Sequence, residues 1–426
     1  MIDLKELKTR RDEIAQNICD RHMSVDIDEI IELQEKRSNL MQESEAYRAK
    51  RNENAQKMKS KLDNETRSML ILEGKQIKET IATLEAELET LEKEFQLKAR
   101  TIPNYYHQSA PVGKEDKDST AIKFVGKPTV FDFKPKDHVE LGEQLDLIDF
   151  DSATRVSGPK FYYLKNQAVI LQMALERYAM DIVMKHGFTP FITPDIAKEE
   201  ILNGIGFNPR GEESNIYNLE GTGTCLVGTA EITLGGYYAN QMLEKSDLPI
   251  KMAGLSHCFR REAGGAGQYS KGLYRVHQFS KLEMFIYCLP EDSDAYHQQL
   301  LAIEEEIFGG LGLCYRIVDT CTGDLGAPAY RKFDIEAWMP GRGETGEYGE
   351  VTSTSNCTDY QARSLGIRYK DDEGKTQFVH MLNGTAIALS RAMVAILENY
   401  QTADGSVRIP EALVPLTGFE VIKART

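Results

Sequence analysis

A long stretch without helix breakers, residues 28–100, constrains the fold of this chain most. It contains no proline and a single glycine, Gly74. Its second half carries apolar residues at alternating spacings of four and three, namely Ile77, Ile81, Leu84, Leu88, Leu91 and Phe95. Its first half carries a looser apolar stripe, at Ile30, Leu33, Leu40, Tyr47 and Met58. Such stripes are typical of long helices that pack against each other. With a turn near 63–65 and a stop at Pro103, they predict an antiparallel helical hairpin.

The charge along this hairpin is uneven. Residues 48–61 include six basic side chains and one acid, whereas residues 79–94 include six acids and one lysine. The basic side chains, which would lie toward the tip, are Arg48, Lys50, Arg51, Lys57, Lys59 and Lys61. A cluster of this kind can bind the phosphates of a structured RNA, although most charge runs are solvated helix faces. The hairpin alone leaves both interpretations open.

Composition limits the class of protein. A chain of 426 residues can form two or three domains, and a net charge of −15 excludes a general nucleic-acid binder, so any RNA contact must be local. No apolar run reaches the ~18 residues of a transmembrane helix, and the N-terminus lacks a signal-peptide core. The seven cysteines form no CxxC pair, which argues against a zinc site or a disulfide framework. We expect a cytoplasmic protein with no membrane partner, or an organellar one whose transit peptide has been removed.

A second hairpin is predicted around a glycine-rich loop. Two extended runs, 258–262 and 274–283, flank residues 263–272, which include four glycines. Because strand side chains alternate, Arg260 and Glu262 should share one face. The second run should present its own set on one face, namely Arg275, His277, Phe279, Lys281 and Glu283. Arginines, an aromatic ring and carboxylates make a poor core, but they suit a flat base, a polyphosphate and a small zwitterion.

Two other segments offer oxygen ligands. Thr229 and Glu231 should point the same way from a strand, where a hydroxyl and a carboxylate suit an ammonium group. Glu350 precedes a run of small hydroxyl residues, a combination that suits magnesium on a phosphate. Residues three apart in a regular strand face opposite ways, so Glu350 and Ser353 can act together only if the strand ends or bends there.

The C-terminal part holds one further candidate. Residues 382–391 should open a helix that runs to about Tyr400 and is almost entirely small or apolar. Arg391 would be buried in it, and a buried guanidinium needs an anion. Upstream, residues 138–141 should be extended, and helical periodicity at 161–186 precedes a proline-containing strand at 187–194.

These segments together resemble a known family. The pattern Phe-Arg-x-Glu, loop, Arg-x-x-x-Phe at 259–279 resembles motif 2 of class II aminoacyl-tRNA synthetases, and its continuation through Glu283 resembles the seryl-tRNA synthetase version. The segments 161–194 and 382–391 resemble motifs 1 and 3. The helical hairpin is similar to the tRNA-binding arm of seryl-tRNA synthetases, of the bacterial or organellar type.

The resemblance implies an α+β fold. It consists of an N-terminal antiparallel coiled-coil arm and a class II catalytic domain, built on an antiparallel β-sheet flanked by helices. The tRNA-binding domain would comprise residues 1–105 and the aminoacylation domain residues 106–426. A homodimer is implied as well, because motif 1 builds the dimer interface in class II enzymes.

The resemblance also implies the activity of a serine–tRNA ligase. L-serine would react with ATP to give seryl-adenylate, and the seryl group would pass to the 3′ end of tRNA(Ser), with tRNA(Sec) as a further candidate acceptor. Arg260 and Arg391 would be catalytic, Glu350 and Ser353 would hold Mg²⁺, and the six basic arm residues would bind tRNA. Serine would be bound by Thr229, Ala230, Glu231, Arg260, Glu283, Asn383 and Thr385. ATP would be bound by Arg260, Arg261, Glu262, Arg275, Val276, Phe279, Glu350, Val351, Thr352, Ser353 and Arg391.

Two alternatives share most of these features. One is a paralogue that activates serine for an acceptor other than tRNA, and the intact basic arm argues against it. The other is a non-catalytic relative that only binds tRNA. The presence of Arg260, Glu350 and Arg391 argues against that alternative.

Overall fold

The computed structural model describes residues 1–207, 215–262 and 272–423, which fall into two compact units, Met1–Pro103 and Asn104–Thr426. The loop predicted at 263–272 lies almost entirely outside the described residues. None of the helices within the described ranges is long and apolar enough to cross a membrane.

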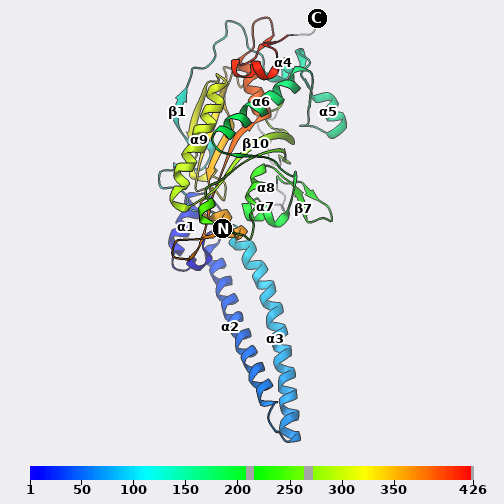
Figure 1. Ribbon diagram of the computed structural model, residues 1–426, viewed down its shortest axis with the longest axis vertical. Helices are drawn as coiled ribbons and strands as arrows, with labels where there is room; N and C mark the ends of the chain where they lie inside the picture. The colour runs from blue at the N-terminus through cyan, green and yellow to red at the C-terminus, as the bar shows by residue number, and fades with distance from the viewer. Residues whose placement is uncertain (208–214, 263–271, 424–426) are drawn as a thin grey trace. The chain divides into compact units, whose positions relative to one another are not determined.

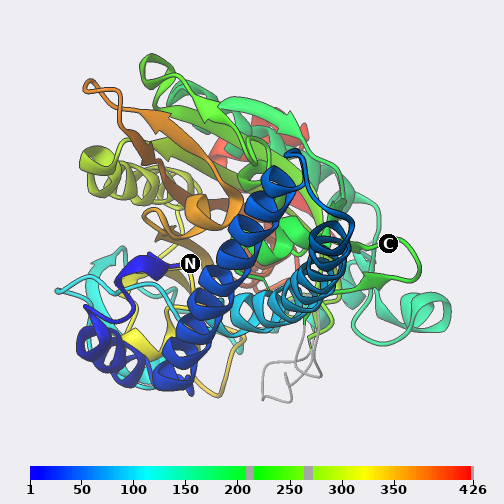
Figure 2. The same ribbon diagram turned by 90° about the horizontal axis from the view of Figure 1, so that it is seen from below.

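The first unit is helical. A short helix, α1 (Arg11–Asp20), precedes two long ones, α2 (Ile27–Lys57) and α3 (Asn64–Ala99), which run side by side (Figure 1, Figure 2). Asp63 caps α3 by accepting a hydrogen bond from the backbone N–H of Thr66 at 2.8 Å, which fixes the predicted turn.

Side chains across the hairpin define its direction. Arg37 contacts Glu92, and Arg48 contacts Glu85 at 2.7 Å, so the residue numbers rise on one helix as they fall on the other. The apolar stripe is buried at Ile77, Ile81, Leu84 and Phe95. The predicted antiparallel hairpin is therefore confirmed.

The second unit is built on an eight-stranded sheet in the order β1-β11-β12-β13-β16-β10-β9-β4. Its strands are β1 (Thr120–Val125), β4 (Thr189–Ile192), β9 (Ile250–Phe259), β10 (Gln278–Cys288), β11 (Tyr315–Asp319), β12 (Arg331–Met339), β13 (Glu347–Asn356) and β16 (His380–Ala388). Neighbours are antiparallel except β4 and β9. β4, which contains Pro190, forms one edge, as its proline predicts.

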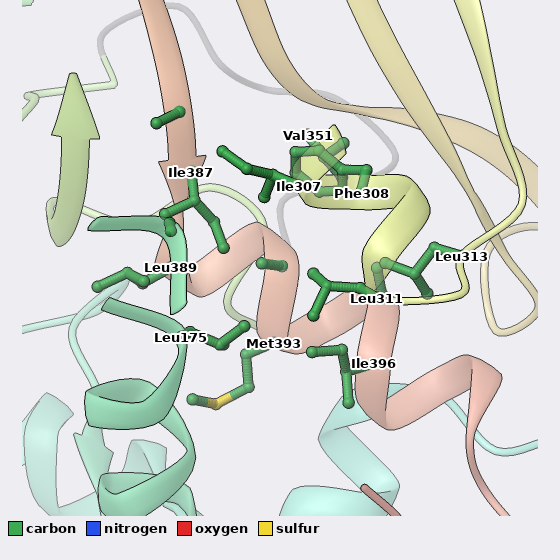
Figure 3. Packing of buried hydrophobic residues seen from close by; sticks show 14 of the residues in the cluster. Leu175, Ile307, Phe308, Leu311, Leu313, Val351, Ile387, Leu389, Met393 and Ile396 are labelled. Atoms are coloured by element: carbon green, nitrogen blue, oxygen red, sulfur yellow. The ribbon is translucent and has the colours of Figure 1, made fainter. Parts of the chain in front are cut away.

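Helices cover both faces of this sheet. Along β10, Met284 and Ile286 belong to one apolar cluster, whereas Phe285 and Tyr287 belong to another, because strand residues alternate between faces. The first cluster includes side chains of α6 (Gln167–Lys185), α9 (Ser293–Gly310) and α11 (Leu389–Asn399). Figure 3 shows part of it. The second includes side chains of α7 (Glu199–Ile205), α8 (Ala230–Gly235) and α10 (Tyr360–Leu365). The predicted α+β architecture is confirmed.

Several local predictions were wrong. Residues 138–141 lie in helix α4 (His138–Gln144) rather than a strand, because Asp137 caps the backbone N–H groups of Val139 and Glu140. The segment 382–391 does not begin as a helix. It continues β16 to Ala388 and becomes helical only at Leu389. A central strand that is buried on both faces has no alternation, and periodicity cannot separate it from a buried helix.

Candidate active site

A pocket of about 540 Å³ lies over β10, β13 and β16 and reaches the beginnings of α8 and α11. It gathers fifteen of the predicted serine- and ATP-binding residues: Thr229, Glu231, Arg260, Glu262, Arg275, Val276, Phe279, Glu283, Glu350, Val351, Thr352, Ser353, Asn383, Thr385 and Arg391. Two predicted residues do not line it. Ala230 is buried in an apolar cluster, and the backbone N–H of Arg261 donates to Asn215.

The motif-2 hairpin reaches the pocket in a different way from the one predicted. Phe279, Lys281 and Glu283 share one face of β10, as alternation predicts. Residues 275–277 precede the strand, so Arg275 and Val276 both line the pocket although they are neighbours. The prediction for His277 was wrong. Its ring contacts Phe161 and Tyr217 instead.

One end of the pocket is a buried polar cluster around Glu283. The Thr229 and Thr385 hydroxyls each donate to Glu283 Oε2 at 3.3 Å. Thr385 comes into register because the pairing of β10 with β16 shifts by one residue between Leu282 and Glu283, which leaves Ala386 as the extra residue. These hydroxyls and the carboxylate form a small cavity floor that can hydrogen-bond a hydroxyl and an ammonium.

Thr229 and Glu231 do not come from a strand as predicted. Thr229 is the N-cap of α8, its hydroxyl accepts from the backbone N–H of Glu231, and Glu231 lies in the first helical turn. Burial raises the pKa of Glu231 to about 7, the charge of Glu283 adds to this effect, and a hydrogen bond from Gln361 opposes it. Thr229 and Glu231 still line the same pocket, because the N-cap side chain of a helix lies beside the first turn of that helix.

Lys281 is a pocket residue to which the sequence assigned no role. It is only 6% exposed, forms an ion pair with Glu283 and donates to the Thr385 hydroxyl at 3.2 Å. Strand alternation placed it on the right face. A lysine there could have been recognised as the counter-ion that buried carboxylates need.

The other end of the pocket holds three arginines. Arg260 lies over the Phe279 ring at 5.2 Å, and Arg275 is 3.9 Å from Glu262. Arg391 contacts the Glu350 carboxylate at 2.8 Å and the Glu350 carbonyl at 3.2 Å. Three guanidinium groups and an aromatic ring that line one pocket suit a phosphorylated aromatic base.

The condition for Glu350 and Ser353 to act together is met. In the pairing of β12 with β13, Ile335 faces Thr352 and Glu336 faces Glu350, so Val351 is an extra residue. This β-bulge brings Glu350 and Ser353 to the same pocket although they are three apart.

The same two residues fit a magnesium ion by their chemistry. Burial acts to raise the pKa of Glu350, but the charges of Arg391 and Lys332 outweigh it, so the net pKa is lowered and the carboxylate is ionised at neutral pH. Within the described ranges, no group of three or more His, Cys, Asp or Glu side chains could hold a metal. Magnesium commonly takes one or two carboxylates and completes its shell with water and substrate phosphate.

The six basic residues that the sequence assigned to tRNA binding are all exposed. Two of them are engaged in ion pairs, Arg48 with Glu85 and Lys57 with Glu53 at 2.8 Å, and Lys50 lies over the Tyr47 ring at 4.6 Å.

Comparison with known proteins relates both units to one family. Residues 217–400 match the tRNA synthetase class II core domain (G, H, P, S and T), and residues 1–106 match the seryl-tRNA synthetase N-terminal domain. Serine–tRNA ligase of Treponema denticola is 64% identical over 99% of this chain and 100% of its own length. The same ligase of Borrelia garinii subsp. bavariensis is 53% identical over 99% of both chains.

Solved structures agree with this relation. Seryl-tRNA synthetase from Pyrococcus horikoshii, complexed with ATP, superposes with a TM-score of 0.89 at 40% identity over 100% of both chains. Cytoplasmic serine–tRNA ligase from Naegleria fowleri, in complex with AMP, superposes with a TM-score of 0.82 at 32% identity, over 97% of this chain and 95% of its own.

Proposed function

This chain belongs to the seryl-tRNA synthetase family of class II aminoacyl-tRNA synthetases, and we propose that its pocket activates L-serine with ATP for transfer to tRNA(Ser). The serine carboxylate attacks the α-phosphorus of ATP, the bond to the leaving pyrophosphate breaks, and seryl-adenylate forms. The terminal ribose hydroxyl of the tRNA then attacks the seryl carbonyl, and AMP leaves. Positioning and charge neutralisation supply most of the catalysis in phosphoryl-type displacements, which suits a pocket rich in arginine.

The polar cluster around Glu283 is the proposed serine site. Thr229, Glu231 and Asn383 hold the ammonium group, and Glu283 and Thr385 bind the side-chain hydroxyl. A site that hydrogen-bonds a substrate hydroxyl rejects the analogue that lacks it by ~10⁴–10⁵, so alanine should be a poor substrate. Threonine must be refused by shape, since it keeps the hydroxyl and adds a methyl group.

The arginine end is the proposed ATP site. Phe279 stacks on the adenine, while Glu262 and the backbone near Val276 contact its edge. Arg260 binds the α-phosphate and the serine carboxylate, and Arg275 and Arg391 bind the distal phosphates. This assignment is supported by the convergence of the three guanidiniums on one pocket.

We assign magnesium to Glu350 and Ser353. Bound there, the ion would neutralise charge on the ATP phosphates. The chain supplies an ionised carboxylate and a hydroxyl at that position, and Arg391 holds the carboxylate in place.

The hairpin is the proposed tRNA-binding element of residues 1–105, and residues 106–426 form the proposed catalytic domain. The six basic residues of the hairpin would contact tRNA phosphates. They form a local positive cluster on a chain whose net charge is negative. tRNA(Sec) is a second candidate acceptor. The cytoplasm, where serine, ATP and tRNA meet, is the proposed location.

We further propose a homodimer formed through α6 and β4. β4 is an edge strand, and large apolar side chains on these elements face solvent: Met173 is 58%, Met184 48% and Ile192 89% exposed. An exposed apolar patch beside an open strand edge suits contact with a second copy.

One observation carries the functional proposal: a single pocket unites the hydroxyl-binding cluster of Glu283 with the arginine end of Arg260 and Arg391. The test is serine-dependent exchange of pyrophosphate into ATP, followed by charging of tRNA(Ser). We expect exchange with serine and little with alanine or threonine. Absence of serine-dependent exchange would overturn the proposal.

A further inference from the structure

Tyr274 separates the active-site pocket from a second hollow in the same unit. It lines both the pocket described above and a cavity of about 680 Å³ whose walls include Asp137, Glu398 and the loop residues 341–345. The loop connects β12 with β13 and carries Arg342, which lines the second hollow but not the first.

The Tyr274 ring has two guanidiniums in contact with it. Arg391 is 4.8 Å from the ring centre and Arg342 is 4.7 Å from it. Each guanidinium is attracted by the electron-rich face of the ring. The hydroxyl of Tyr274 donates to the Glu350 carbonyl at 3.0 Å, and Arg391 donates to the same carbonyl. Tyr274 therefore fixes Arg391 and the backbone of Glu350 together.

The loop is built to bring Arg342 close. A side chain on Gly349 would meet Arg342 Nη1 at 2.2 Å and the Tyr274 hydroxyl at 3.2 Å, so only glycine allows this approach. The Arg342 side chain is only 18% exposed, and Glu347 lies 3.7 Å from its Nε. A largely buried cation is costly unless it has compensating partners, and Glu347 and the Tyr274 ring are two such partners for Arg342.

We propose that Arg342 is a positioning residue, which holds Tyr274, and through it Arg391, in the orientation that receives the terminal phosphates of ATP. The inference rests on the proposed function, since it assigns Arg391 to those phosphates. Arg342 touches no substrate. Because Arg342 acts on Arg391 through the ring of Tyr274, replacing Arg342 should have no effect on ATP binding once that ring has been removed.

The test measures pyrophosphate exchange in the full-length protein. Arg342→Gln keeps most of the side-chain length without the charge. We expect about a three- to tenfold rise in the KM for ATP, the scale of one partly buried cation–π contact, with the KM for serine unchanged. Arg342→Lys should restore part of the ATP affinity, because it keeps the cation. A wild-type KM for ATP in Arg342→Gln would overturn the proposal.

A double-mutant cycle tests whether Arg342 acts through Tyr274. Tyr274→Leu removes the ring, whereas Tyr274→Phe keeps the ring and removes the hydroxyl, which contacts the Glu350 carbonyl and Arg342. Adding Arg342→Gln to Tyr274→Leu should cause no further rise, whereas adding it to Tyr274→Phe should still raise the KM for ATP. Independent, multiplying effects in the Leu background would contradict action through Tyr274.

A matched control lies elsewhere in the same unit. Arg363 lies over the Phe378 ring at 4.7 Å and pairs with Asp359, outside the lining of both hollows. Arg363→Gln should leave the KM for ATP unchanged, and an equal rise there would reduce the Arg342 effect to general destabilisation. Loss of the proposed function would appear differently, as absence of serine-dependent exchange in the wild-type protein itself.

Discussion

The guanidinium of Arg391 lies 2.8 Å from the carboxylate of Glu350, in the same pocket that holds the Glu283 cluster. In the ligand-free protein, each group is the counter-ion of the other. Under the proposed assignment, Glu350 would hold magnesium and Arg391 would hold the phosphates of ATP. The pair thus keeps both groups ionised and in place before ATP arrives.

Replacing Arg391 should damage the ATP step specifically. In Arg391→Ala we expect serine-dependent exchange to fall by ~10²–10³, the typical loss when one preorganised donor to a developing charge is removed. Calorimetric binding of serine should persist, because, among the described residues, Arg391 contacts Glu350 and Tyr274 rather than the Glu283 cluster of the proposed serine site. Arg408→Ala, an exposed arginine on a short strand, is the control and should exchange normally. Normal exchange in Arg391→Ala would remove Arg391 from the phosphate site.

Serine binding should depend on pH through Glu231. Burial raises the pKa of this carboxyl to about 7, so it becomes neutral as the pH falls through that value. An ammonium group binds a carboxylate better than a neutral acid, so the KM for serine should rise on going from about pH 8 to about pH 6. Glu231→Gln should bind serine weakly, with a flatter profile over this range.

The Glu231 carboxyl also links serine binding to the release of a proton. Near pH 7, serine binding should shift Glu231 to its ionised form, and calorimetry in buffers of different ionisation enthalpy should detect the released proton. A serine KM that does not change with pH, together with no proton release, would place the ammonium elsewhere.

Lys281 should matter for both stability and serine recognition. In Lys281→Met, Glu283 would be left as a buried charge without its ion pair, which typically costs 3–5 kcal/mol in free energy of unfolding, measurable by chemical denaturation. The KM for serine should rise as well, because Thr385 loses the donor that orients its hydroxyl. The double variant Lys281→Met/Glu283→Gln should recover much of the stability but not the serine affinity. Recovery of both would remove Lys281 and Glu283 alike from the proposed serine site.

What the sequence predicted correctly is what local periodicity determines. The 4-3 stripe at 77–95 and the looser stripe before it predicted the two long helices, and alternation along β10 predicted the shared face of Phe279, Lys281 and Glu283. What it missed depends on tertiary context. The bulge at Val351 is set by the neighbouring strand, and no local pattern marks it.

The other features that the sequence did not predict also depend on tertiary context. β16 is buried on both faces, so it carries no alternation to distinguish it from a helix. The single capping hydrogen bond of Thr229 turns an apparent strand into a helix start. The arginine at position 342 gave no signal in the sequence, because its partner Tyr274 lies 68 positions earlier in the chain.

The hairpin should act on tRNA alone. Arg51, Lys59 and Lys61 are exposed and, among the described residues, have no ion-pair partner, so they are free to meet phosphates. Replacing all three with alanine should raise the KM for tRNA(Ser) and lower the salt dependence of binding by roughly two to three units in the slope of log K against log salt. Pyrophosphate exchange, which needs no tRNA, should remain normal. The control Lys93→Ala removes a lysine paired with Glu89 on the acidic part of the same hairpin and should leave charging intact. Unchanged charging and salt dependence in the triple variant would show that the basic cluster is only a solvated helix face.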